Sequence, residues 1–316
     1  MGKLAYFLGL QVEYKTNGDI FVNQAKYVKD LLHKAGMDDC KPCATPCKPH
    51  NQVLTTEGTL LSDPTHYRSL VGTLQYLTFT RPDIAFAVNT VCQYMNSPTD
   101  VHFGMVKRIL RFLQGTLRCG LKYTSGTSMA LSAFSDSDWA ADLNTRRSIT
   151  GYVVYLGENP ISWQSKKQAS VSRSSTEAEY RALAHTTADI AWIRLILRDV
   201  HQFLSLPPLI HCDNQSAIAL SLNPVQHSRI KHLETDFHFV RERVQKGDLV
   251  IQYVSTQDQV ADVLTKGLFQ QHLPSSSEAV PRSEAANDQP PVPPPFVAPP
   301  TAEIPPTTET YPKQPL

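Results

Sequence analysis

The sequence of 316 residues lacks an excess of either charge, and its formal net charge is only +1. This balance excludes an overall basic character, so any binding of nucleic acid must depend on local groups of basic residues. It also lacks an apolar run long enough to cross a bilayer, an opening signal peptide and a myristoylation site. We therefore expect an intracellular protein, in the cytoplasm or the nucleus, with no membrane partner.

Cysteine is sparse, with six residues, and three of them stand close together. Cys40, Cys43 and Cys47 have the spacing C-x-x-C-x-x-x-C, which leaves a metal knuckle open as one interpretation. His50 is the only further ligand near this group, and prolines interrupt the set. Free thiols in a reducing compartment are the favoured interpretation.

Apolar residues make up 41% of the sequence, which suits a globular core over much of the chain. The composition changes after Leu273, because residues 274–316 hold more than half of the 23 prolines and almost no large apolar side chains. Such a segment cannot bury enough apolar surface to offset an ordering cost of roughly 1–2 kcal/mol per residue. We expect a disordered Pro-rich tail over 274–316, in which a proline-dependent peptide ligand is the less favoured alternative.

The first 125 residues predict a hairpin followed by helices. Asn17-Gly18 lies between two apolar-rich runs, which is the strongest short signal for a hairpin. Apolar periodicity then predicts helices over 24–34, 65–78, 82–95 and 99–114, with a long surface connection over 38–65. Lys107, Arg108 and Arg111 lie on the last helix, where they indicate either a solvated face or phosphate contacts with a duplex.

From about residue 130 the pattern changes to short strands and interspersed helices. The expected strands cover 131–136, 151–156, 161–164, 209–212 and 249–254, and the expected helices cover 175–200, 215–221, 232–246 and 258–266. This order predicts an α/β fold, in which a mixed five-stranded sheet carries helices on both faces.

Carboxylates occur at four points of this pattern. Asp136 ends the first strand, Glu179 lies in the long helix, and Asp213 and Asp262 follow at the fourth strand and in the last helix. Converging carboxylates repel each other by about 4 kcal/mol per pair at 4 Å with an effective dielectric near 20, unless cations or raised pKa values relieve the repulsion. Asp138 points to the same strand face as Asp136, so alternation alone does not separate the two.

The sequence around these acids resembles the ribonuclease H domain of copia-type retrotransposon Pol polyproteins, and the resemblance extends from about residue 4 to residue 273. Its motifs are Phe134-Ser135-Asp136-Ser137-Asp138-Trp139, Ser174-Ser175-Thr176-Glu177-Ala178-Glu179-Tyr180, Cys212-Asp213-Asn214-Gln215-Ser216, Val260-Ala261-Asp262-Val263-Leu264, Tyr6-Phe7-Leu8-Gly9-Leu10, Tyr67-Arg68-Ser69-Leu70-Val71-Gly72 and Thr80-Arg81-Pro82-Asp83-Ile84-Ala85. The resemblance implies a reverse-transcriptase palm remnant over 1–48, a helical thumb or connection segment over 49–125 and a ribonuclease H domain over 130–273.

The resemblance also implies a reaction, the hydrolysis of the RNA strand of an RNA–DNA hybrid. Asp136, Glu179, Asp213 and Asp262 would be catalytic residues and ligands of two Mg²⁺ ions, for which Mn²⁺ could substitute. The substrate-binding residues implied are Asn214, Gln215, Lys166, Lys167, Arg173 and His232. The partners implied are the hybrid and the polymerase part of the polyprotein, with no small-molecule substrate. The paired aspartates of the polymerase belong upstream of Tyr6, so no DNA synthesis is expected.

One departure from cellular ribonucleases H leaves the proton shuttle unassigned. Those enzymes carry a His in a loop before the final acidic helix, whereas residues 254–262 form a short segment without His. A metal site at His232 and His238 is one interpretation, but they are six residues apart and not the four that would align them on a helix. We prefer contacts with the nucleic-acid backbone, and a plain surface role stays open as the alternative. Two alternatives remain open. One is a decayed or domesticated remnant that binds nucleic acid or a protein without catalysis. The other, weaker one is an integrase-like transferase.

Overall fold

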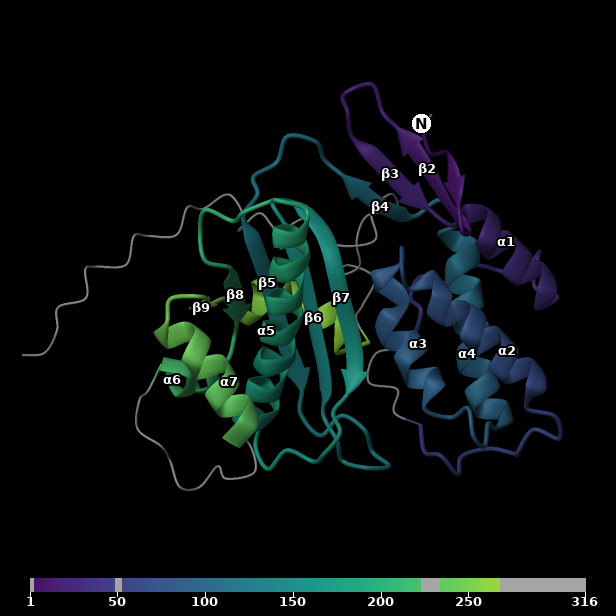
Figure 1. Ribbon diagram of the computed structural model, residues 1–316. Coiled ribbons are helices and arrows are strands. Elements are labelled where there is room, and N and C mark those ends of the chain that lie inside the picture. The colour runs from purple at the N-terminus through teal and green to yellow at the C-terminus, as the bar shows by residue number, and fades with distance from the viewer. Residues whose placement is uncertain (1–2, 49–52, 223–233, 268–316) are drawn as a thin grey trace, which may run out of the picture.

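The computed structural model describes residues 3–48, 53–222 and 234–267. Figure 1 shows two parts side by side, a small sheet with a helical bundle and a larger sheet flanked by helices. The predictions for His232 and for the tail over 274–316 fall outside the described residues. Within the described ranges, no helix combines the length and the apolar content needed to cross a membrane.

The small sheet is antiparallel throughout and has the strand order β1-β2-β3-β4. Its strands are Tyr6–Phe7 (β1), Leu10–Tyr14 (β2), Ile20–Asn23 (β3) and Gly120–Tyr123 (β4). The hairpin predicted at Asn17-Gly18 is confirmed, since Tyr14 pairs with Ile20 across it. Positive φ angles at Leu8 and Gly9 split the first predicted run into two strands.

The helices of the N-terminal part share one hydrophobic core. They are Ala25–Lys34 (α1), Thr65–Leu77 (α2), Pro82–Ile84 (η1, a 3₁₀ turn), Ala85–Cys92 (α3) and Asp100–Gly115 (α4). Leu31 of α1 packs in the same buried cluster as Leu70 of α2 and Leu110 of α4. The two segments predicted over 1–48 and 49–125 are therefore packed together, and β4 returns the chain to the first sheet.

The arginines of α4 contact the preceding connection. Arg108 Nη2 donates to Thr45 Oγ1 at 2.7 Å, and Arg111 Nε donates to the Lys41 carbonyl at 2.7 Å. Lys107 stacks over the Phe103 ring. Neither sequence interpretation included this arrangement, in which the two half-buried arginines hold a folded segment. Cys43 and Cys47 of the same segment pack against the helical core.

The larger sheet is mixed, has the order β7-β6-β5-β8-β9 and confirms the predicted α/β class. Its strands are Leu131–Asp138 (β5), Ile149–Leu156 (β6), Asn159–Lys167 (β7), Leu209–Cys212 (β8) and Val250–Tyr253 (β9). The first three are antiparallel neighbours, whereas β8 runs parallel to β5 and β9 runs parallel to β8.

Helices cover the two faces of this sheet differently. The long helix Ser175–Asp199 (α5) lies across the face seen in Figure 1, with Gln215–Leu222 (α6) and Glu234–Gln245 (α7) beside it. The 3₁₀ turns Thr256–Asp258 (η3) and Val260–Leu264 (η4) lie behind the sheet. Alternation along β5 matches this division, because Ala133 packs in the cluster of α5 while Phe134 packs in the cluster of η4.

The last predicted helix, over 258–266, is wrong, since the chain forms two short 3₁₀ turns there. Gln259, between them, has an extended backbone and a buried side chain. Its amide nitrogen donates to the Ser135 carbonyl at 3.1 Å, and its side-chain oxygen accepts from Ala261 N at 3.2 Å. The hydrogen bond to β5 holds Gln259 in an extended conformation, which interrupts a continuous helix at this residue.

Candidate active site

Asp136 lies on β5, on the sheet face that η4 covers, and is 2% exposed. The Thr265 hydroxyl donates to its Oδ2, and Lys266 Nζ lies 3.8 Å from the same oxygen. Burial raises the pKa of Asp136 to about 6, the Lys266 ammonium opposes this change, and the Asp262 carboxylate adds to it. Asp136 is therefore a buried acid with incomplete compensation of its charge.

Gly151 makes the close approach of η4 to Asp136 feasible. It is the residue of β6 directly opposite Asp136 in the sheet. A Cβ atom at Gly151 would lie 2.6 Å from Thr265 Cγ2 and 2.8 Å from Leu264 Cβ, distances that real side chains do not adopt. Glycine here lets the segment that carries Asp262, Thr265 and Lys266 pack directly on the strand.

Glu179 lies in the second turn of α5 and is 5% exposed. Its Oε1 accepts from the Ser137 backbone N at 3.0 Å and from the Ser137 hydroxyl at 3.2 Å. Burial, followed by the Asp136 and Asp213 carboxylates, raises the pKa of Glu179 to about 9. The surroundings of Glu179 therefore disfavour its charged form unless a cation compensates the charge.

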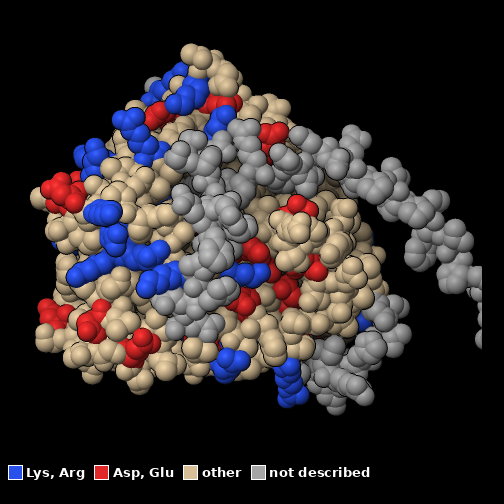
Figure 2. Space-filling model, turned by 180° about the vertical axis from the view of Figure 1, so that it is seen from behind, with Lys and Arg blue, Asp and Glu red and all other residues tan. Residues whose placement is uncertain are grey.

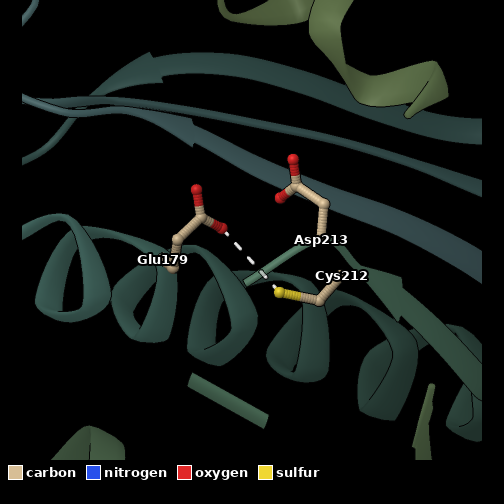
Figure 3. Close-up of side chains that lie close together, drawn as sticks. All are labelled: Glu179, Cys212 and Asp213. Carbon is tan, nitrogen blue, oxygen red and sulfur yellow. Dashed lines mark hydrogen bonds between the residues drawn. The ribbon is translucent and has the colours of Figure 1, made fainter. Parts of the chain in front are cut away.

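Asp213 directly follows β8, and its side chain lies close to those of Glu179 and Cys212 (Figure 3). Oxygen and sulfur atoms of Glu179, Cys212 and Asp213 all lie within 4.8 Å of one another. Cys212 Sγ is 3.9 Å from Glu179 Oε2, and burial, together with this acid, raises the pKa of the thiol. Thr256 Oγ1 donates to Asp213 Oδ2 at 3.0 Å. Nothing in the sequence pattern singles out Cys212, although it immediately precedes Asp213 in the motif.

Asp262 belongs to η4 and is bound by Lys266, whose Nζ lies 2.7 Å from Asp262 Oδ1. The four carboxylates thus form a connected series, in which Asp262 and Asp136 share Lys266, Asp136 acts on the pKa of Glu179, and Glu179 adjoins Asp213. Figure 2, which views the molecule from behind relative to Figure 1, shows a group of acidic side chains near the middle of that face.

The predicted substrate-binding residues differ in exposure and in their contacts within the protein. Lys167 is engaged within the protein, since its Nζ lies 2.7 Å from Asp142 Oδ2 and 2.8 Å from Gln93 Oε1. Lys166 and Arg173 are exposed. Asn214 Oδ1 caps α6 by accepting from Ala217 N at 2.9 Å, and Gln215 beside it is exposed. Lys167 therefore has a structural contact that its position in the sequence did not indicate.

The residues present fit divalent cations. The donors are carboxylate oxygens, which Mg²⁺ prefers, and two of the acids are almost fully buried with pKa values raised by burial and by mutual repulsion. A cation that favours the charged forms would remove this electrostatic cost. Asp138 lies further along β5. Against the effect of burial, the carboxylates of Asp136, Asp262 and then Asp138 raise the pKa of Lys266.

A mixed five-stranded sheet with acids on β5, on α5, after β8 and on η4 defines a ribonuclease H-like domain. No family model matches the chain. The chain is similar to a retrovirus-related Pol polyprotein from transposon RE1 of Arabidopsis thaliana, with 48% identity over 266 residues, 84% of this chain and 18% of the polyprotein. A Pol polyprotein from transposon TNT 1-94 of Nicotiana tabacum is 36% identical over 84% of this chain and 20% of the polyprotein.

The chain belongs to the retrovirus-related Pol polyproteins of copia-type transposons, and its larger sheet forms a ribonuclease H-like domain. It spans about a fifth of the length of these curated relatives. Among solved structures, it is similar to RNase H1 from Halobacterium salinarum, with 17% identity, a TM-score of 0.32 and coverage of 43% of this chain and 94% of that one. The fold assignment itself rests on the strand order described above.

Proposed function

We propose that this chain hydrolyses the RNA strand of RNA–DNA hybrids in a reaction that depends on divalent metal ions. The observation that carries the proposal is the series of four carboxylates on β5, on α5, directly after β8 and on η4, two of them buried. Asp136, Glu179, Asp213 and Asp262 would hold two Mg²⁺ ions. Bound there, such ions would supply an activated water and charge stabilisation for the leaving oxygen of a phosphodiester.

The protein's own residues would position these acids. Ser137 orients Glu179 through two hydrogen bonds, Thr265 orients Asp136, and Thr256 orients Asp213. Because these three acids each have a partner from a different element, their carboxylates would be held in place before any ion arrives. This preorganisation is the contribution that the fold makes to catalysis.

The hybrid is the substrate class that this site and the family favour. Only one strand of a hybrid carries 2′-hydroxyls, and they line a wide, shallow minor groove. Asn214 and Gln215 stand beside Asp213 at the start of α6, where side-chain amides can donate to a 2′-hydroxyl. Lys166 and Arg173 are the exposed cations that we assign to the DNA phosphates, and Lys167 is left out of that role.

Cleavage of an end-labelled hybrid by the purified chain tests the proposal. We expect cuts in the RNA strand with Mg²⁺, none with a chelator, and none in duplex DNA of the same sequence. Glu179→Gln should remove cleavage, while Glu177→Gln, two residues away on the same helix, serves as the matched control. Hybrid binding without cleavage by the wild-type chain under any divalent ion would favour the alternative of a remnant that binds only.

A further inference from the structure

In the part of the chain that the structure describes, Lys266 is the cation that forms ion pairs with this acidic group. Its ammonium lies 2.7 Å from Asp262 Oδ1 and 3.8 Å from Asp136 Oδ2, so it sits at two carboxylates that belong to different elements. It stands four residues after Asp262, just beyond η4, and the close packing of η4 on Gly151 brings it to the sheet. The contact therefore results from the tertiary fold and not from the local pairing alone.

The acidic group divides into two halves around this lysine. Asp136 and Asp262 form the half that Lys266 partly neutralises, and Glu179 with Asp213 forms the other. Among the residues that the structure describes, the ion pairs made by these four acids are those with Lys266. The first half carries a counter-charge within the chain, whereas neither acid of the second half forms an ion pair within the described ranges.

We propose that Lys266 is a tethered cation that occupies the Asp136–Asp262 half of the site and competes there with a divalent metal ion. The inference rests on the proposed function, because it assumes that the carboxylates bind metal. A divalent ion in this half needs oxygens from both aspartates, and these are the oxygens that the ammonium now contacts.

Displacement of Lys266 is sterically feasible. Its side chain is 36% exposed, while that of Asp136 is 3% exposed, so the lysine can leave and the aspartate cannot. A lysine has a flexible four-carbon stem and a strongly hydrated ammonium, which allow the charge to move to solvent while the stem stays packed. The half formed by Glu179 and Asp213 should therefore fill first, and the half that holds Lys266 should fill at higher metal concentration.

Calorimetric titration of the full chain with Mg²⁺, and with Mn²⁺ as a second probe, tests this competition. In Lys266→Met we expect the weaker of the two binding steps to become about tenfold tighter, because a positive charge no longer opposes the ion. Lys266→Arg, which keeps the charge, should bind as the wild type does. Lys246→Met is the matched control. Lys246 forms the same kind of i,i+4 ion pair, with its Nζ 2.6 Å from Glu242 Oε1, but this pair does not belong to the acidic group.

Thermal unfolding gives a readout that does not depend on cleavage. In a chelator, Lys266→Met should melt at a lower temperature than the wild type, because Asp136 and Asp262 then repel without compensation. Saturating Mg²⁺ should raise its melting temperature more than that of the wild type, and Lys246→Met should show no such excess. A large rise with metal also shows that the variant is folded.

The outcomes separate the two proposals. A wild-type chain that binds no ion by calorimetry refutes the metal-dependent function and this inference with it. If the wild type binds metal but Lys266→Met binds it with unchanged or weaker affinity, the competition is refuted while the metal site stands. Equal tightening in Lys266→Met and Lys246→Met would mean that only overall charge matters, which also refutes the assignment of Lys266.

Discussion

Glu177 and Glu179 differ in role although both are buried near the start of the same helix. The backbone N of Glu177 donates to the cap residue Ser174 at 3.2 Å, and its carboxylate accepts from Arg173 N at 2.9 Å and pairs with Arg181 at 2.9 Å. Residues two apart on a helix point about 200° away from each other. The carboxylate of Glu179 accordingly contacts Ser137 on β5, in the acidic group.

These contacts predict opposite phenotypes for one substitution at two positions. Glu177→Gln should cost about 1 kcal/mol, typical of a weakened cap, and leave cleavage of the hybrid mostly intact. Glu179→Gln should remove cleavage and barely weaken hybrid binding, because it alters a metal ligand. Cleavage rates, hybrid affinities and urea unfolding of both variants provide the comparison. An exchange of the two phenotypes would show that the helix register is wrong.

The raised pKa of Glu179 predicts how the metal-free chain responds to pH. Its pKa moves from an ordinary 4.5 to about 9, so between these values the folded state holds a proton that the unfolded state has lost. Stability therefore falls as pH rises through this window. The pKa of Asp136 rises from 3.8 to about 6, so this acid affects stability over a lower range of pH. A comparison at about pH 6.5 and about pH 8.5 thus isolates Glu179 from Asp136.

We expect the urea midpoint of the wild type in a chelator to be lower at the higher pH, and Glu179→Gln to reduce that difference. Mg²⁺ should restore the midpoint at the higher pH, since it stabilises the charged carboxylate. Glu177→Gln provides the control, because its acid belongs to an ion pair outside the site. If Glu179→Gln keeps the full pH dependence, the proton is held elsewhere.

At the scale of elements, the packing of η4 on β6 sets the distance between Asp136 and Asp262. Gly151→Ala would place a Cβ 2.6 Å from Thr265 and 2.8 Å from Leu264, so η4 must shift. Overpacking of this kind costs typically about 1–3 kcal/mol. We expect a lower melting temperature, together with weaker metal binding and slower cleavage. Gly104→Ala in α4 is the control, because a Cβ there meets nothing within 4 Å.

A Gly151→Ala variant that loses stability but keeps metal affinity and cleavage would separate the packing of η4 from the geometry of the site. Gly104→Ala should be neutral or slightly stabilising, since alanine is the better helix former by roughly 0.8–1 kcal/mol. Metal titration and thermal unfolding of both variants measure the two effects independently.

The elements that the sequence predicted well carry strong local signals. The strands β5 and β8 and the helix α5 were placed to within two residues at each end, because apolar runs and a capping Ser mark them. The strand β4 was missed, since it is only Gly120–Tyr123 and pairs with β3, about a hundred residues earlier in the chain. The contacts of Lys266 and Lys167 within the protein were not predicted, because tertiary packing selects the partners of long side chains.

At the scale of the whole molecule, the N-terminal part completes the face of the sheet that η4 covers. Ala85 of α3 and Leu121 of β4 belong to the same buried cluster as Phe134, Val153 and Tyr155 of the larger sheet. Polar contacts reinforce this cluster, with Trp163 Nε1 donating to the Thr78 carbonyl at 2.9 Å and Lys167 Nζ donating to Gln93 at 2.8 Å. The two parts share one core, although their predicted limits near residue 125 stay a prediction.

This shared core predicts that residues 130–316 will not form a stable ribonuclease H unit when produced without residues 1–129. The excised chain would expose the apolar surface that Ala85 and Leu121 now cover, and exposed apolar surface of this kind promotes association. We expect a melting temperature several degrees below that of the full chain, or aggregation, and a loss of cleavage.

A protease site inserted at Gly126, where a Cβ meets nothing within 4 Å, supplies the control. After nicking there, the two pieces should copurify and keep cleaving the hybrid, because the core between them is intact. An excised chain that melts and cleaves like the full one would show that the N-terminal part only abuts the larger sheet.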